Sequence, residues 1–264
     1  MQDTKRILRL VESALLMAVA AVLSFVKLFD LPYGGAVTAC STLPLIVIAY
    51  RHGTRWGVFA GAAYGLLQLV LGMSVLSYCP SALSAAAVIV LDYLLAFAAM
   101  GLGGVWRRGR TQSRALIGGA LMTGGVRYAC HVISGCTVWA GLSIPTDAAL
   151  LYSLAYNVTY MLPETVVTAL GAWYLSQALD LRGERPARAE SVRHSGKTAL
   201  AAKAAVALTA IADVVLICAH LQDAESGEFR FSGLAAVPWV TVGIVTTVGI
   251  AAAVAAWWLS RRKK

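Results

Sequence analysis

Four residues in the stretch VRYACHVISGCTVW, residues 126–139, give the first sign of chemistry in this sequence. They are Arg127, His131, Gly135 and Trp139, each four residues after the last. On a helix this spacing forms one slowly rotating stripe. Because the surrounding tract is apolar, its ionisable side chains are expected to face a bundle interior or a cavity. The stripe therefore predicts a buried polar site.

Two other apolar tracts supply polar groups for the same site. VLDYLLAF contains a carboxylate, Asp92. LLYSLAYNVTYMLPE contains an amide, three phenols and a second carboxylate: Asn157, Tyr152, Tyr156, Tyr160 and Glu164. Aromatic faces stack on rings and attract cations, and a carboxylate in low dielectric can neutralise a positive ligand. Together these side chains suit a small flat heteroaromatic ligand, which could be cationic.

The composition indicates which elements must position these residues. The 264-residue chain is 59% hydrophobic and 13% charged, whereas about 25% of residues are charged in a soluble domain. A helix needs about 20 apolar residues to cross a bilayer. The sequence therefore predicts an all-α polytopic membrane protein. Its candidate spans are residues 10–28, 37–50, 56–73, 82–105, 115–140, 150–178, 198–219 and 235–259.

The spans fall into two groups separated by a basic polar stretch. We expect a six-helix domain over 1–180, a basic cytoplasmic linker over 181–197, and an additional two-helix transmembrane segment of unknown role over 198–264. The second span is short and contains Pro44, so it is either a half-span or a continuation of the preceding loop.

The positive charges indicate how the chain lies in the bilayer. With the N-terminus in the cytoplasm, 18 of the 22 lysine and arginine residues fall in cytoplasmic segments, the exceptions being Lys27, Arg127, Lys203 and Arg230. This bias follows the positive-inside rule and predicts that both termini are cytoplasmic. The formal net charge of +9 is then a topology signal and not a nucleic-acid footprint. The N-terminus also resembles a signal peptide, but a retained first helix is favoured over cleavage.

In this topology the polar groups of three helices meet between the outer surface and the midplane. Asp92 lies about ten residues into its span, or about 15 Å deep. Structural roles remain open for the others: Trp139 and Tyr152 could be interface anchors, and Arg127 could pair with Glu164 to hold helices together. A single intramembrane histidine is often a packing group. Asp92 is hardest to explain structurally, because charge at that depth needs a partner or a function.

Catalytic and metal-binding motifs are absent from the sequence. It contains no H-E-x-x-H, G-x-x-x-x-G-K-[ST] or G-x-S-x-G. Its five cysteines show no paired metal spacing. We therefore expect a binding or transport protein without a cofactor or metal, and any ATP hydrolysis that drives transport belongs to another chain.

Four blocks carry a resemblance to a known family. They are LPYGGAVTACSTLPLIVIAYRHGTRWGVFAGAAYGLLQLVLG (31–72), LDYLLAFAAMGLGG (91–104), VRYACHVISGCTVW (126–139) and YSLAYNVTYMLPE (152–164). They resemble the thiamine-specific substrate-binding subunits of energy-coupling factor transporters, the ThiT/YuaJ family, over about residues 8–178. The resemblance implies a six-helix protein of a prokaryotic cell membrane that binds thiamine with high affinity from the outside. It also implies a membrane coupling subunit and two cytoplasmic ATPases as partners.

The resemblance assigns roles to particular residues. The family's acidic ligand falls on Asp92, followed by Tyr93, and some relatives have glutamate there. The remaining ligands of the helices fall on His131, Gly135, the stacking Trp139, Tyr152 and Asn157.

Two further segments take roles from the resemblance. The first outer loop, a lid over the site, corresponds to residues 32–35, where Tyr33 stands in place of the tryptophan of some relatives. The small-xxx-small motif that meets the coupling subunit matches Ala14 and Ala18 in the first helix. The two C-terminal spans are additional to the family core.

An alternative function from another class is a stand-alone, proton-coupled secondary transporter of a small cationic heteroaromatic solute. Asp92, Glu164 and His131 would then relay protons. Transport by this chain alone would favour that alternative. The sequence also leaves open whether the ligand is thiamine, one of its phosphates or its pyrimidine precursor.

Overall fold

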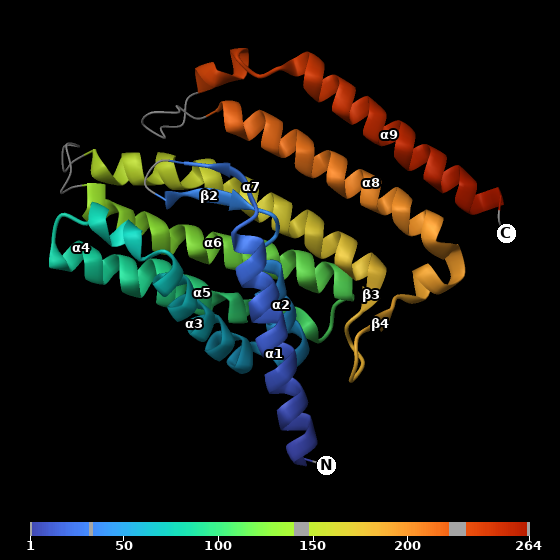
Figure 1. The fold of residues 1–264 in the computed structure, drawn as a ribbon, viewed down its shortest axis with the longest axis horizontal. Coiled ribbons are helices and arrows are strands. Elements are labelled where there is room, and N and C mark those ends of the chain that lie inside the picture. The colour runs from blue at the N-terminus through green and yellow to red at the C-terminus, as the bar shows by residue number, and fades with distance from the viewer. Residues whose placement is uncertain (1, 32–33, 140–147, 222–230, 263–264) are drawn as a thin grey trace.

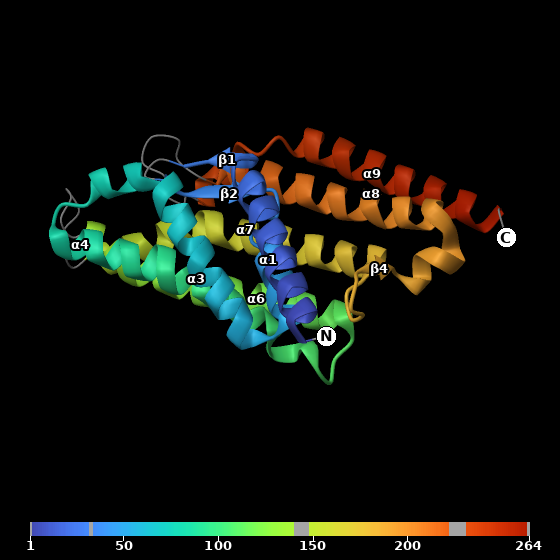
Figure 2. The same cartoon turned by 60° about the horizontal axis from the view of Figure 1, so that its bottom comes forward.

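The computed structural model describes residues 2–31, 34–139, 148–221 and 231–262. Nearly all of this part of the chain is helical, as the sequence predicts, and it contains two short antiparallel hairpins. The first hairpin pairs β1 (Lys27–Asp30) with β2 (Ala36–Thr38), and the second pairs β3 (Leu179–Asp180) with β4 (Ala187–Arg188). Figures 1 and 2 show α6 (Gln112–Trp139), α7 (Ala149–Ala178), α8 (Glu190–His220) and α9 (Trp239–Arg262) following one another side by side.

Helices occur at all eight positions predicted to span the membrane. They are α1 (Gln2–Ser24), α2 (Leu43–His52), α3 (Thr54–Leu71), the run α4 (Ala82–Ala87), η3 (Val88–Leu95), α5 (Ala96–Ala98) and η4 (Ala99–Arg107), α6 (Gln112–Trp139), α7 (Ala149–Ala178), α8 (Glu190–His220) and α9 (Trp239–Arg262). Two short 3-10 helices, η2 (Met73–Tyr78) and η5 (Phe231–Ala235), lie in the connections. Within the described residues, five runs are long and apolar enough to cross a membrane: Asp3–Ser24, Ala82–Arg107, Gln112–Val138, Gly196–His220 and Trp239–Arg262.

The short second span is a half-length helix preceded by a strand. Residues 36–38 pair with β1, and helix α2 begins at Leu43 and has 10 residues. Pro44 stands in the first turn of α2, where a missing backbone N–H leaves no helical hydrogen bond unmade. The helical part of this segment is therefore shorter than the predicted span of residues 37–50.

Helix α2 lies at the centre of the first apolar core. Its residues 44–50 are all buried, and Leu45, Ile46 and Ile48 are among the largest fully buried side chains of the described chain. Glycines let the neighbouring helices approach it closely, because a Cβ at Gly104 would clash with the Ala49 carbonyl oxygen. This close packing positions α3 and η4 against α2.

Helix α1 is held much more loosely than α2. In Figures 1 and 2 it runs steeply across the long helices, and its N-terminal end projects away from them in Figure 1. Its inward face is fastened by a hydrogen bond of 2.8 Å from Trp56 Nε1 to Ser13 Oγ. Its other face is open: Leu15 is 64% exposed, and Ala14 and Ala18 are also exposed.

A buried arginine of α2 connects the β3–β4 hairpin to α1. Arg51, whose side chain is 4% exposed, donates through Nε and Nη2 to the Glu12 carboxylate. It also donates through Nη1 to the Leu181 carbonyl at 2.7 Å and through Nη2 to the Glu184 carbonyl at 3.0 Å. The first part of the predicted linker is therefore a folded hairpin, because a buried guanidinium holds its carbonyl groups.

Replacing Arg51 with glutamine should destabilise the whole chain. Removing one partner of a buried ion pair typically costs about 3–5 kcal/mol, and the hairpin carbonyls would lose their donor. We expect the unfolding temperature of the detergent-solubilised protein to fall by at least about 5 °C. Lys5→Gln is the matched control, because Lys5 pairs with Glu184 of the same hairpin at 66% and 79% exposure and exposed pairs contribute little. Equal shifts in both variants would contradict this account.

Candidate ligand-binding site

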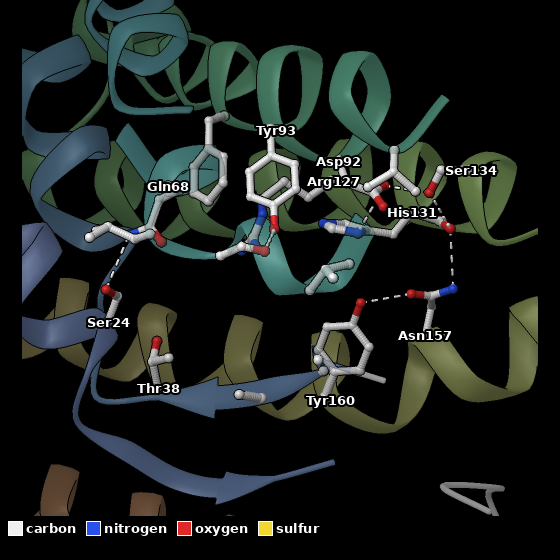
Figure 3. Close-up of a pocket in the computed structure, with 18 of the residues that line it drawn as sticks. Ser24, Thr38, Gln68, Asp92, Tyr93, Arg127, His131, Ser134, Asn157 and Tyr160 are labelled. Atoms are coloured by element: carbon white, nitrogen blue, oxygen red, sulfur yellow. Dashed lines mark hydrogen bonds and ion pairs between the residues drawn. The ribbon is translucent and has the colours of Figure 1, made fainter. Parts of the chain in front are cut away.

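A cavity of about 450 Å³ lies among α3, η3, α6, α7 and the β1–β2 hairpin. This volume is in the range of sites for small molecules. Figure 3 shows its polar side chains arriving from opposite walls: Asp92, Tyr93, His131 and Ser134 on one side, Asn157 and Tyr160 on the other. The cavity therefore brings together the three tracts that the sequence singled out.

Asp92 is presented by an unusual helical turn. It lies in η3, a π-helical run within an otherwise α-helical and 3-10 segment. π-Helical turns are rare and occur often at functional sites. The backbone of η3 is pressed against α3, since a Cβ at Gly65 would clash with the Tyr93 carbonyl oxygen. Tyr93 also donates from Oη to the carbonyl of Gly72, the C-cap residue of α3, at 3.2 Å. The residue that follows Asp92 is therefore held at two points.

The Asp92 carboxylate is oriented by two groups on α6. Ser134 Oγ donates to Asp92 Oδ1 at 2.5 Å, and His131 Nδ1 lies 3.0 Å from the same oxygen. The other imidazole nitrogen, His131 Nε2, is buried and has no hydrogen-bond partner among the described residues. No described lysine or arginine forms an ion pair with Asp92. The site therefore offers a carboxyl group and a ring nitrogen whose hydrogen-bonding capacity is unused.

The opposite wall is an amide–phenol pair on α7. Asn157 Nδ2 donates to the Ser153 carbonyl at 2.9 Å and lies 3.3 Å from the His131 carbonyl. Tyr160 Oη donates to Asn157 Oδ1 at 2.7 Å. Gly135 makes this closeness possible, since a Cβ there would clash with Ser153 Oγ. These contacts tie α6 to α7 directly beneath the cavity.

The cavity lining also includes a pair of oppositely charged residues, Arg127 and Glu164. Arg127 Nη1 lies 3.4 Å from Glu164 Oε2, which confirms that these two residues pair. Thr38 of β2 donates to Glu164 Oε1 at 3.0 Å, so the pair also fastens the hairpin. Glu164 thereby has an arginine partner inside the protein, whereas no described lysine or arginine pairs with Asp92.

The structure places the predicted site residues as follows. The cavity lining includes Asp92, Tyr93, His131, Gly135 and Asn157. Tyr152 is not in the lining: its ring stacks on that of Tyr156 at a centroid distance of 6.4 Å, and Tyr156 lines the cavity. Tyr33 and the side chain of Trp139 lie outside the described residues, whereas Gly34 and Gly35 of the same loop line the cavity.

Several lining residues were not predicted as ligands. Ser134 is one of them, although it lies three residues after His131 in the stretch that the sequence singled out. Gln68 is another, and the sequence does carry a signal for it: it is a single amide in the apolar run YGLLQLVLG, where a polar side chain is expected to face a cavity. It donates from Nε2 to Ser24 Oγ at 3.1 Å and also bonds to Tyr64 Oη, and all three residues line the cavity.

Reactive and metal-binding chemistry finds little support in the described residues. They contain no group of three or more His, Cys, Asp or Glu side chains that could hold a metal ion. Burial raises the pKa of the Cys79 thiol, which lines the cavity in the connection before α4. This thiol is therefore protonated at neutral pH and is a poor nucleophile. The arrangement is suited to holding a small cation or aromatic ring.

Comparison with known proteins identifies similar chains. The thiamine transporter protein family (Thia_YuaJ) matches residues 10–180. The thiamine transporter ThiT of Bacillus subtilis is 31% identical over 182 residues, which cover 64% of this chain and 91% of that protein. ThiT of Lacticaseibacillus paracasei is 27% identical and aligns over 64% of this chain and 86% of its own length. A solved structure of ThiT from Listeria monocytogenes superposes with a TM-score of 0.54 at 27% identity, covering 65% of this chain and 94% of that one.

A methyl group added at the α3–η3 contact should disturb the site. Gly65→Ala would push its Cβ into the Tyr93 backbone carbonyl, and overpacking of this kind costs about 1–3 kcal/mol. We expect a lower unfolding temperature and a changed near-ultraviolet circular dichroism signal, because Tyr93 must move. Gly125→Ala on α6 is the control, since a Cβ there meets nothing within 4 Å. An unaltered Gly65→Ala protein would show that the contact does not constrain η3.

Proposed function

Because the chain belongs to the thiamine transporter protein family, we propose that it is a membrane protein of thiamine uptake and not an enzyme. More specifically, we infer that it is the high-affinity thiamine-binding subunit of an energy-coupling factor transporter. The observation that carries the proposal is the Asp92 carboxylate, which faces a ring-sized cavity without an arginine or lysine partner among the described residues. A cationic ring supplies the missing positive charge.

The bound thiamine is proposed to lie across the cavity. Its thiazolium is balanced by Asp92, and attraction between opposite charges is strong where water is excluded. The buried and unpartnered His131 Nε2 meets the ligand from the same wall. The pyrimidine stacks on Trp139, and Asn157 faces its polar edge. Tyr152 then acts indirectly, by supporting the cavity-lining Tyr156.

The loop between β1 and β2 is proposed to cover the ligand. Gly35 N donates to Tyr156 Oη at 3.2 Å, which fixes the loop to α7. Gly34 has a φ of +94°, a conformation that favours glycine. Tyr33 belongs to the same loop, and we propose that it contributes to the lid.

Uptake is proposed to require further protein chains, which hydrolyse ATP and couple that hydrolysis to transport. The sequence has no ATP-binding P-loop, so two cytoplasmic ATPases and a membrane coupling subunit would supply these functions. Small residues permit close approach of helices in lipid, and Ala14 and Ala18 are exposed on α1. We place both termini in the cytoplasm of a prokaryote, because that topology puts most basic residues inside. The proton-relay alternative is less favoured, since Arg127 and Thr38 already engage Glu164.

Asp92→Asn tests the proposed charge partner. The variant keeps the shape of the side chain and removes its charge, and an unpaired buried charge costs about 3–5 kcal/mol. Thiamine affinity measured by isothermal titration should fall at least about a hundredfold. A neutral analogue without the thiazolium charge should lose much less.

The control is a second carboxylate within a membrane helix. Asp213→Asn on α8 also removes a carboxylate, but Asp213 does not line the cavity, so its thiamine affinity should be unchanged. Circular dichroism confirms that each variant is folded. Equal losses of the charged and neutral ligands in Asp92→Asn would show that Asp92 is a packing residue and would reopen the proton-relay alternative.

Leucine at Ala14 and Ala18 tests the proposed docking face. The larger side chains would hold a partner helix away, so co-purification with the coupling subunit should be lost while thiamine binding persists. Leucine at Ala251 and Ala252, which are exposed on α9, is the matched control and should leave assembly intact. Assembly that survives the change on α1 would disprove the assignment.

A further inference from the structure

The C-terminal helix α8 packs against the hairpin that walls the cavity. Ile211 and Val214 of α8 pack against a buried apolar cluster that includes Val37 of β2 and Tyr156 of α7. Leu28 and Phe29 of β1 pack against the same cluster, so helix and hairpin share one core. Figure 1 shows the hairpin lying between α1 and α8, across α7.

The inner side of this hairpin belongs to the binding site. Gly35 and Thr38 line the cavity, and each also bonds to α7, through Tyr156 and Glu164 respectively. The hairpin is thus held from within by α7 and from without by α8. A movement that exposes the cavity on this side must break packing on both faces.

Helix α8 is itself firmly held. Lys203 Nζ donates to Gln177 Oε1 of α7 at 2.7 Å. Thr246 Oγ1 of α9 donates to Asp213 Oδ2 at 2.8 Å. A Cβ at Gly249 of α9 would clash with Thr209, so the α8–α9 backbones are in close approach. Helix α9 therefore fixes α8 from the side opposite the hairpin.

This outer support lies beyond the part of the chain shared with the family. The family match ends at residue 180, whereas α8 begins at Glu190. The Listeria ThiT structure aligns over 94% of its own length with only 65% of this chain. A chain ending near residue 180 would leave the apolar cluster shared with the hairpin without Ile211 and Val214.

We propose that α8 is an intramolecular clamp on the β1–β2 hairpin that slows ligand exchange, with Ile211 and Val214 as its positioning residues. Loss of these contacts makes it easier for the hairpin to move away from the cavity. The polar side chains that line the cavity stay in place. The rates of ligand entry and release then both rise, and the equilibrium affinity changes less than either rate. The proposal rests on the proposed function only for the identity of the ligand.

The test compares two double variants of the full-length chain. Ile211→Ala with Val214→Ala removes the packing on the hairpin. Val206→Ala with Leu208→Ala is the matched control, because both of these α8 side chains are exposed. Without ligand, amide hydrogen exchange across residues 27–38 should accelerate about fivefold in the first variant, equivalent to about 1 kcal/mol. Exchange in α2 and α6 should stay as in wild type, and the control variant should match wild type throughout.

Stopped-flow tryptophan fluorescence with thiamine gives the second measurement. Association and dissociation should both accelerate by a similar factor in the first double variant. If the double variant does not fold, Ile211→Val takes its place. This variant removes one methylene group and should show a smaller change of the same kind. Failure of wild type to bind thiamine would count against the proposed function, and hydrogen exchange would still decide the clamp. Unchanged hairpin exchange, or exchange accelerated equally everywhere, would overturn the clamp.

Discussion

The candidate site is organised by one carboxylate, Asp92, that has no lysine or arginine partner among the described residues. A charge removed from water is costly unless hydrogen bonds or an opposite charge stabilise it. The Asp92 carboxylate accepts a hydrogen bond from the Ser134 hydroxyl and contacts the His131 imidazole. No described arginine or lysine forms an ion pair with it. These contacts hold the carboxylate in place, and in the proposed function its charge balances that of the ligand. Glu164, with Arg127 beside it, shows how the same bundle balances a charge that it keeps for itself.

Holding that carboxylate at a helix surface requires an irregular backbone. Asp92 lies in the π-helical run η3. Helix α3 packs closely against η3 through Gly65 and against α5 through Gly61. Such close approach is possible only without Cβ atoms. Gly65 of α3 therefore helps to set the position of the backbone that carries Asp92 and Tyr93.

Side-chain spacing within single helices was enough to predict part of this arrangement. Asp92, His131 and Asn157 are polar residues in apolar tracts, and such residues face a common interior because lipid excludes them. The spans followed from hydropathy for the same reason. The π-helical run, the β1–β2 hairpin and the partnership of Ser134 with Asp92 depend on contacts between segments far apart in the chain. No local pattern encodes them, because each is decided by what packs against it.

The segment between α1 and α2 connects features that the sequence presents as separate. Ser24 ends α1 and accepts a hydrogen bond from Gln68, and both line the cavity. Farther along, the hairpin bonds to α7 through Thr38 and shares an apolar cluster with α8. A ligand that touches this wall therefore contacts a segment tied to the exposed helix α1 at one end and to the C-terminal helices at the other. Rigid packing along the wall would transmit a displacement to both, because close-packed interiors are poorly compressible.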